Sequence, residues 1–196
     1  GTSGSSGVGG QATSAQIGLS WNINAAPNGD LYIPDQSYYV VRKVEYSTGI
    51  ISIVAGTGSN AASGDGGYAT SAAIQAPQGV FMSPLGELFI SSTTGCNIRK
   101  VSAAGIISTF VGIGTCTTGT EGVAATSSAL SSPYSMWGDS GGNVFVLNQS
   151  PGGNVRRIDA ATGIIQTMAG SMTGGGFSGD GGAATAALFA ASYQMS

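Results

Sequence analysis

Short apolar or alternating runs recur along the whole chain, separated by glycine-rich turns. Residues 64–120 show this most clearly, with runs at 80–82, 88–90, 98–101 and 106–111. None has the 3.6-residue period of an amphipathic helix, and runs of this length between turn residues are typical of β-strands. Glycine separates the first two runs of each segment, as a tight antiparallel connection requires. These glycines are Gly29, Gly86, Gly141 and Gly142. The pattern predicts meanders of four strands.

Three short motifs repeat along the chain with a period of about 57 residues. One is Ala-Thr, one is a strand-like motif with two adjacent basic residues, and one is Gly-Ile-Ile. They begin at Ala12, Ala69, Ala125 and Ala184, at Val41, Ile98 and Val155, and at Gly49, Gly105 and Gly163. Four meandering strands per repeat of this length are typical of a propeller blade. The sequence therefore predicts an all-β protein built of β-propeller blades.

The order of motifs within one repeat is also specific. Residues 64–109 contain Gly-Asp-Gly-Gly-Tyr-Ala-Thr-Ser-Ala, Pro-Gln-Gly-Val, Gly-Glu-Leu-Phe-Ile, Ile-Arg-Lys-Val and Gly-Ile-Ile-Ser-Thr in that order. This succession resembles the NHL repeat, the blade unit of NHL β-propellers, and the resemblance covers essentially the whole chain. It implies the propeller fold and a role as a binding or assembly scaffold. It implies no single activity, because propellers host many unrelated functions. The acidic loop departs from the pattern in residues 7–10 and 121–124, which read Gly-Val-Gly-Gly and Glu-Gly-Val-Ala.

The repeats divide the chain into one propeller segment with parts 1–63, 64–120 and 121–178 and a partial fourth repeat, 179–196. The 196 residues hold about 3.4 repeats, whereas closed propellers need about four to eight blades. We therefore expect about three blades plus part of a fourth, forming an incomplete ring. Residues 188–196 fall where the first strand of the fourth blade is expected. The missing strands would come from further blades or from neighbouring subunits.

Composition narrows the classes of function. Charged residues make up 8% of the chain, against roughly 25% in a typical soluble domain, so the surface is poorly protected against association. Histidine is absent, which removes the commonest general base and the usual zinc ligand. The net charge of −3 offers no footprint for a phosphate backbone, and no apolar run approaches the roughly 20 residues that cross a bilayer. We expect no catalytic residue, metal, cofactor, nucleic-acid partner or membrane span.

All six basic residues lie in the strand-like motifs, as Arg42-Lys43, Arg99-Lys100 and Arg156-Arg157. Because alternate residues of a strand point to opposite faces, the members of a pair cannot line one anion-binding pocket. We expect structural roles, in which arginines bond carboxylates and loop carbonyls between blades, with Asp35 as the partner of Arg42. Asp65 and Asp180 lie in Gly-Asp-Gly-Gly loops. We expect these carboxylates to bond their own turns, because calcium requires about six to eight oxygen ligands.

Cys96 and Cys116 lie 20 residues apart. One falls between the second and third predicted strands of its blade and the other just after the fourth, and these connections emerge at the same end of a meander. A disulfide is therefore expected, with two independent buried thiols as the alternative. A disulfide would indicate an oxidising compartment.

Asn148 begins the only N-glycosylation triplet and is a possible glycan site, although its position at a strand end favours hydrogen bonding instead. The Ser/Thr-rich loop 115–120 is an alternative site for O-linked glycans. Aromatic residues recur at or next to matching first-strand positions, where we expect packing between blades rather than a ligand pocket. They are Trp21, Phe81 and Trp137.

Three classes of function remain open. The first is a non-catalytic extracellular scaffold, a structural or adhesive repeat protein that assembles with neighbouring subunits or blades into a surface fibre or filament. The second is the propeller domain of a secreted lyase or hydrolase whose catalytic residues lie outside this segment. The third is an intracellular NHL protein-interaction module. The sparse charge and the expected disulfide favour the first, at the extracellular or cell surface, with possible glycans.

Overall fold

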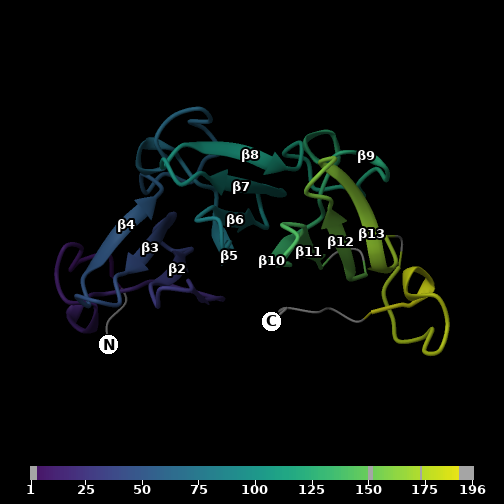
Figure 1. Ribbon diagram of the computed structural model, residues 1–196, viewed down its shortest axis with the longest axis horizontal. Coiled ribbons are helices and arrows are strands. Elements are labelled where there is room, and N and C mark those ends of the chain that lie inside the picture. Colours follow the sequence, from purple (N-terminus) through teal and green to yellow (C-terminus); the bar gives the residue numbers. More distant parts are fainter. Residues whose placement is uncertain (1–3, 150–151, 173, 190–196) are drawn as a thin grey trace. The chain divides into compact units, whose positions relative to one another are not determined.

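The computed structural model describes residues 4–149, 152–172 and 174–189. It contains three sheets, each with a meander of four strands in which consecutive strands of the chain are neighbours in the sheet (Figure 1). The first sheet comprises β1 (Asn24–Ala25), β2 (Leu31–Asp35), β3 (Val40–Val44) and β4 (Ile51–Ala55). The second comprises β5 (Pro77–Met82), β6 (Leu88–Ser92), β7 (Asn97–Val101) and β8 (Ile107–Val111). The predicted all-β fold with propeller blades is confirmed.

The third sheet has a fifth strand that the sequence pattern did not predict. Its first four strands are β10 (Pro133–Gly138), β11 (Val144–Asn148), β12 (Asn154–Ile158) and β13 (Ile164–Gly170). The short strand β9 (Val123–Ala124) precedes them in the chain and pairs antiparallel with β13. Within the described residues the Ala-Thr motifs form short 3-10 turns, η1 (Ala12–Ser14), η2 (Ala69–Ser71), η3 (Ala125–Ser127) and η4 (Ala184–Ala186).

In the first and third sheets, the pairing of β3 with β4 and of β12 with β13 is irregular next to the basic residues. The β3–β4 register shifts between Val41 and Arg42, and the β12–β13 register shifts between Val155 and Arg156. An extra residue on one strand of a pair increases the local twist and redirects the neighbouring side chains. The repeat is therefore preserved in strand register as well as in residue type.

The chain divides into two compact units, residues 1–90 with 99–108, and residues 91–98 with 109–196. The core of the first unit contains residues of both its sheets, including Val41, Ala55, Val80 and Ile90. Its loop residues Ala69, Ala72 and Ile74 join the same cluster. Burial of these apolar side chains stabilises the packing of adjacent blades within that unit.

The second unit has its own buried apolar residues. They include Leu130, Met136, Val146, Ile158 and Ile165. The boundaries assigned to the four repeats stay a prediction. The strand expected at 188–196 lies mostly outside the described residues, of which Leu188 and Phe189 are the last. No helix in the described part of the chain is long and apolar enough to cross a membrane.

Candidate functional site

The loop before each blade returns to pair with the fourth strand of that blade. We call its four copies the glycine loops; they comprise residues 7–15, 64–72, 120–128 and 179–187. In the second copy Gly66 N donates to Ile107 O at 2.8 Å, and Ile107 N donates to Gly67 O at 3.0 Å. Ala69 N donates to Gly105 O at 2.8 Å. The loop turns tightly where Gly64 and Gly66 have positive φ values of 88° and 84°, a backbone conformation that glycine adopts without steric cost. The loop thus extends the sheet by a short edge segment.

The same pairing occurs in the first and third copies. Ala12 N donates to Gly49 O at 2.8 Å, and Ala125 N donates to Gly163 O at 2.9 Å. The second and third loops also accept a hydrogen bond from the end of the preceding fourth strand, from Gly56 N to Ala69 O in the second copy. Each of these loops therefore joins two consecutive fourth strands.

In the second and third blades, an arginine of the third strand binds the glycine loop of its own blade. Arg99 forms an ion pair with Asp65 and donates to the carbonyls of Ser63 and Ala73. Arg156 donates to Glu121 Oε1 at 2.9 Å and to the carbonyls of Thr120 and Ala129 at 2.7 and 3.2 Å. The guanidinium groups are almost fully buried, whereas the two carboxylates are 47% and 40% exposed. The predicted bonds to carboxylates and loop carbonyls are confirmed.

The sequence analysis did not predict that the carboxylate of Asp65 binds Arg99. A bond of this carboxylate to its own turn stays a prediction. The sequence carried a signal for the pair of Asp65 and Arg99. Asp65 precedes Arg99 by 34 residues, and Glu121 precedes Arg156 by 35. The matching separation of the two pairs is a signal in the sequence that the acid and the arginine meet in the second and third repeats. The first repeat has Val8 at the acidic position, and Asp180 of the fourth is exposed.

Arg42 is bound differently from the other two arginines. Its Nε donates to Asp35 Oδ2 at 2.9 Å, and both side chains are 0% exposed, which confirms the predicted pair. Asp35 also accepts from the backbone N of Gly18 and of Tyr38, at 3.1 and 3.2 Å. Within the described residues the terminal nitrogens Nη1 and Nη2 of Arg42 are buried without an acceptor. A buried donor without a partner costs about 1–3 kcal/mol, so this arrangement is unusual in a folded protein.

The second basic residue of each pair points to the other face, as predicted. Lys43, Lys100 and Arg157 pair with Asp30, Glu87 and Asp159 at 2.8–2.9 Å. The hydrogen bond from Lys43 is the largest cause that holds the pKa of Asp30 below its usual 3.8, and the bond from Tyr46 N adds to it. Hydrogen bonding to Asp30 in turn raises the pKa of Lys43 above 10.5. All six basic residues therefore take part in ion pairs.

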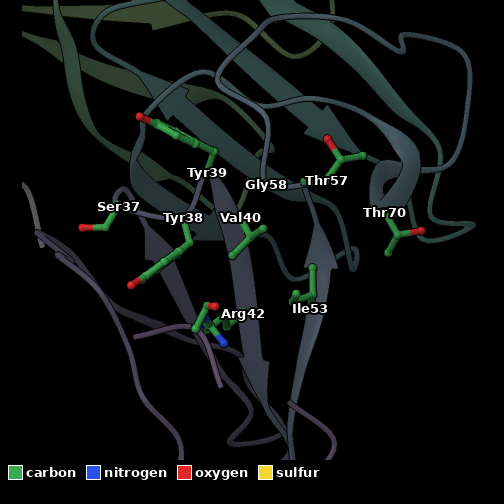
Figure 2. A pocket seen from close by; sticks show the side chains of 11 residues that line it. Ser37, Tyr38, Tyr39, Val40, Arg42, Ile53, Thr57, Gly58 and Thr70 are labelled. Atoms are coloured by element: carbon green, nitrogen blue, oxygen red, sulfur yellow. The ribbon is translucent and has the colours of Figure 1, made fainter. Parts of the chain in front are cut away.

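A pocket of about 650 Å³ lies beside Arg42 within the first unit (Figure 2). Its side chains come from the N-terminal segment before η1, from the β2–β3 turn, from β3 and β4, and from the segment after β4 up to η2. They are those of Ser5, Ser37, Tyr38, Tyr39, Val40, Arg42, Ile53, Thr57 and Thr70, with Gly56 and Gly58 completing the wall. Tyr39 has a positive φ of 53°, a conformation that few residues other than glycine adopt. The sequence indicated no pocket here.

The same place in the third blade is nearly filled. There a cavity of only about 10 Å³ lies beside Arg156, lined among others by Thr118, Gly119 and Asn148. In the second blade Cys96 stands at the position of Tyr39, with a similar φ of 47°. Cys96 forms the expected disulfide with Cys116, with Cα atoms 5.1 Å apart. The three blades therefore differ at this end: the first has a pocket, the second has a disulfide, and the third is nearly filled.

The possible glycan site Asn148 is 3% exposed. Its Nδ2 donates to Asn154 Oδ1 at 3.2 Å, so attachment of a glycan would require the side chain to leave this position. Ser150, the third residue of the triplet, lies outside the described residues. Glycosylation of Asn148 stays a prediction.

Of the three aromatic residues expected to pack between blades, only Phe81 is buried, and packing between blades stays a prediction for it. Phe81 is 5% exposed and stacks on Phe89 with centroids 6.0 Å apart. Trp21 and Trp137 are 54% and 45% exposed, so core packing was the wrong prediction for them. The Trp21 indole N–H donates to Gln36 Oε1 at 2.9 Å, which orients the ring at the surface. Among the described residues, no three His, Cys, Asp or Glu side chains gather as metal ligands would.

Comparison with known proteins concerns the fold. A family model described as the Teneurin NHL domain matches residues 48–120. A solved protein of unknown function from Bacteroides thetaiotaomicron is similar with a TM-score of 0.66 and 19% identity, over 88% of this chain and 40% of that chain. A chain of a nidogen/laminin complex has a TM-score of 0.56 and 11% identity, over 79% and 49%. A gluconolactonase from Xanthomonas campestris has a TM-score of 0.53 and 14% identity, over 78% and 46%.

The chain spans two fifths to half of the length of these solved structures. At such identities the likeness concerns the fold alone, and fold does not determine function. No curated protein sequence matches the chain. The family match supports NHL-type repeats over residues 48–120, and the structural neighbours support the fold.

Proposed function

From the premise that this chain is an NHL-repeat β-propeller, we propose that it is a non-catalytic extracellular scaffold that assembles with further blades or neighbouring subunits. Three features support the proposal. The glycine loops join consecutive blades, the basic residues are engaged in structural ion pairs, and the disulfide suits an oxidising compartment.

The fourth glycine loop carries the proposal. It repeats the conformation of the second copy, with φ of 98° at Gly179 and 80° at Gly181 against 88° and 84° in that copy. Gly182 N donates to Gly179 O at 3.0 Å, as Gly67 N does to Gly64 O at 3.1 Å. The backbone donors that bind a fourth strand in the other copies, Gly181 N and Ala184 N, face no such strand among the described residues. An exposed edge of this kind pairs readily with a further strand.

The experiment removes one of these donors. Ala184→Pro deletes the N–H at the first position of η4, where proline fits the backbone and breaks no bond of the described chain. Ala184→Ser keeps the N–H and is the matched control. We expect source-purified wild type and Ala184→Ser to form larger assemblies by sedimentation velocity and electron microscopy, and Ala184→Pro to be impaired.

Discrete wild-type monomers at all accessible concentrations would contradict the assembly proposal. The compartment is tested separately, by alkylating thiols before lysis and identifying Cys96 and Cys116 by mass spectrometry. We expect both cysteines to resist alkylation and to be recovered from the secreted or surface fraction. Free thiols in an intracellular fraction would favour an intracellular interaction module instead. The likeness to a gluconolactonase supports no activity here, because it concerns the fold alone.

A further inference from the structure

The pocket beside Arg42 contains donors that the chain itself leaves without acceptors. Nη1 and Nη2 of Arg42 have none among the described residues, although the side chain is fully buried. The corresponding nitrogens of Arg99 and Arg156 all bind loop oxygens, and only Nε is left without a partner in those two residues. The unused edge of the guanidinium is therefore specific to the first blade.

We propose that this pocket binds a short extended peptide segment with small, neutral side chains, whose backbone carbonyls accept hydrogen bonds from Nη1 and Nη2 of Arg42. The proposal goes beyond the scaffold function and does not rest on it. It requires only the first unit, which supplies every lining residue of the pocket.

The other two blades indicate which chemistry the nitrogens accept. Arg99 binds the carbonyls of Ser63 and Ala73, and Arg156 binds those of Thr120 and Ala129. In the first blade the carbonyl of Ser6, the counterpart of Ser63, instead accepts from Gln16 N at 3.1 Å. The acceptors lacking in this blade are thus peptide carbonyls, the groups that occupy the equivalent place elsewhere.

Charge favours the same ligand. The carboxylate of Asp35 already neutralises Arg42 inside the protein, and neither group is exposed. An anionic ligand would add a second negative charge to this buried pair and would lose much of its hydration. A neutral carbonyl can accept from the guanidinium without that penalty.

The dimensions and lining of the pocket suit a peptide of a few residues. Its volume of about 650 Å³ lies within the range of about 300–1,000 Å³ typical of ligand pockets. The hydroxyl groups of Ser37, Thr57 and Thr70 provide further hydrogen-bonding positions around it (Figure 2). Because the two nitrogens are shielded from water, a ligand reaches them when a lining side chain moves aside. Tyr38 and Tyr39 are partly exposed and belong to the turn between β2 and β3.

In the third blade, the chain itself fills most of the space that corresponds to the pocket. Thr118 and Gly119 line the small cavity beside Arg156, and the adjoining Thr120 carbonyl binds that arginine. The corresponding segment of the second blade, 61–63, reads Ala-Ala-Ser. Segments with small side chains therefore lie beside the arginine in both sister blades. Their counterpart in the first blade, residues 4–6, lines the pocket through Ser5 but supplies no acceptor to Nη1 or Nη2 of Arg42.

The test uses the whole chain and a capped, uncharged peptide, acetyl-Asn-Ala-Ala-Ser-Gly-amide, which copies residues 60–64. Titration followed by amide and arginine Nε NMR signals is expected to show saturable shifts at Tyr38, Tyr39 and Arg42. Thr70→Trp adds a bulky ring to an exposed lining position and is expected to weaken binding at least about tenfold, equivalent to one or two lost hydrogen bonds. Thr126→Trp changes the exposed counterpart in the third repeat, away from the pocket, and is expected to bind like wild type.

Arg42→Lys provides a second readout, because it keeps the charge beside Asp35 and removes the fork of terminal nitrogens. An NMR spectrum of Arg42→Lys that is unchanged away from the pocket would show that this variant folds. If Arg42→Lys misfolds, Thr70→Trp provides the test. Absence of saturable shifts with wild type at millimolar peptide would overturn the proposal. Equal binding by Thr70→Trp would do the same, as would acetate or maltose binding as tightly as the peptide.

Discussion

At the scale of the residue, one acid decides how the repeated arginine is bound. In the first blade Asp35 ends β2 and takes Nε of Arg42. At the same place the third blade has Asn148, which binds Asn154 instead, and Arg156 turns its terminal nitrogens to the glycine loop. A carboxylate accepts a charge-assisted bond from a buried guanidinium more strongly than an amide does. The first blade therefore binds its arginine through Nε and an inner acid, whereas the third blade binds its arginine through the terminal nitrogens and the glycine loop.

We predict that Asp35→Asn destabilises the chain by about 3–5 kcal/mol, because it leaves the buried Arg42 charge without its counter-ion. Asp180→Asn makes the same change at an exposed carboxylate and is the control, expected within about 0.5 kcal/mol of wild type. Urea unfolding followed by tryptophan fluorescence measures both. Equal stability of the two variants would show that Asp35 does not compensate Arg42.

A pH dependence is also expected at the residue scale. The pKa of Asp30 is lower in the folded chain than its usual 3.8, because Lys43 and the Tyr46 amide donate to the carboxylate. A depressed carboxyl pKa contributes stability that is complete above the unfolded value and is lost as the pH falls through the folded value. The unfolding free energy should therefore decline below about pH 4, the unfolded value for aspartate. Asp30→Asn should show a shallower decline in acid titrations of the urea midpoint, and Asp180→Asn should keep the wild-type slope.

At the scale of the element, the glycine loop makes each sheet larger than its four meandering strands. Three backbone bonds attach the second copy to Ile107 of β8 and to Gly105 just before it, and the third copy is regular enough to form β9. The loop also binds the preceding fourth strand through Gly56 N. A side chain at Gly56 would be strained, because φ is 98° and its Cβ would lie 2.8 Å from Val40 Cα. The link between consecutive blades is thus made by backbone.

Proline substitutions in two copies should separate the effect of this pairing from that of the turn. Ala12→Pro removes the donor to Gly49 O and should cost about 1–3 kcal/mol, since a carbonyl loses its partner. Ala184→Pro makes the same change where the described chain offers no acceptor, and should alter stability by less than about 0.5 kcal/mol when the protein is dilute and monomeric. Thermal and urea unfolding would measure both. A large loss with Ala184→Pro would point to strain in the turn instead.

At the scale of the whole molecule, the chain forms two compact units, each with buried apolar residues of its own. The second unit carries the only covalent cross-link among the described residues, between the β6–β7 turn and the segment after β8. A cross-link of this kind limits the conformations of the unfolded chain. The first unit has a pocket at the equivalent end of its blade and no cross-link there.

Reduction of the disulfide should lower the unfolding free energy by about 3 kcal/mol, as expected for a closed loop of roughly 20 residues. A double Cys96→Ser/Cys116→Ser variant should resemble the reduced wild type and should not respond to reductant. Urea unfolding with and without dithiothreitol measures the difference. A midpoint that is unchanged by reductant in the wild type would mean that the cross-link contributes nothing to equilibrium stability.

Much of the fold could be predicted from the chain because its signals are local. Apolar runs of strand length and glycine at the turns predict each meander, and the strands at 80–82, 88–90, 98–101 and 106–111 are all present. Opposite orientation of adjacent basic residues follows from strand geometry alone. The pairing of Asp35 with Arg42 was accessible for the same reason, since both lie on adjacent strands. The exposure of Trp21 could not be predicted, because exposure depends on which other residues cover the side chain.

The amino-acid sequence by itself determined the strands, the repeat and the positions of its charges, because each depends on alternation and spacing along the chain. Tertiary structure alone decided that the glycine loops become edge segments and that Arg42 retains two unused donors beside a pocket. Those outcomes depend on hydrogen bonds between groups some 35 residues apart, which form or fail over differences of a fraction of an ångström. Residue type and spacing do not specify such distances.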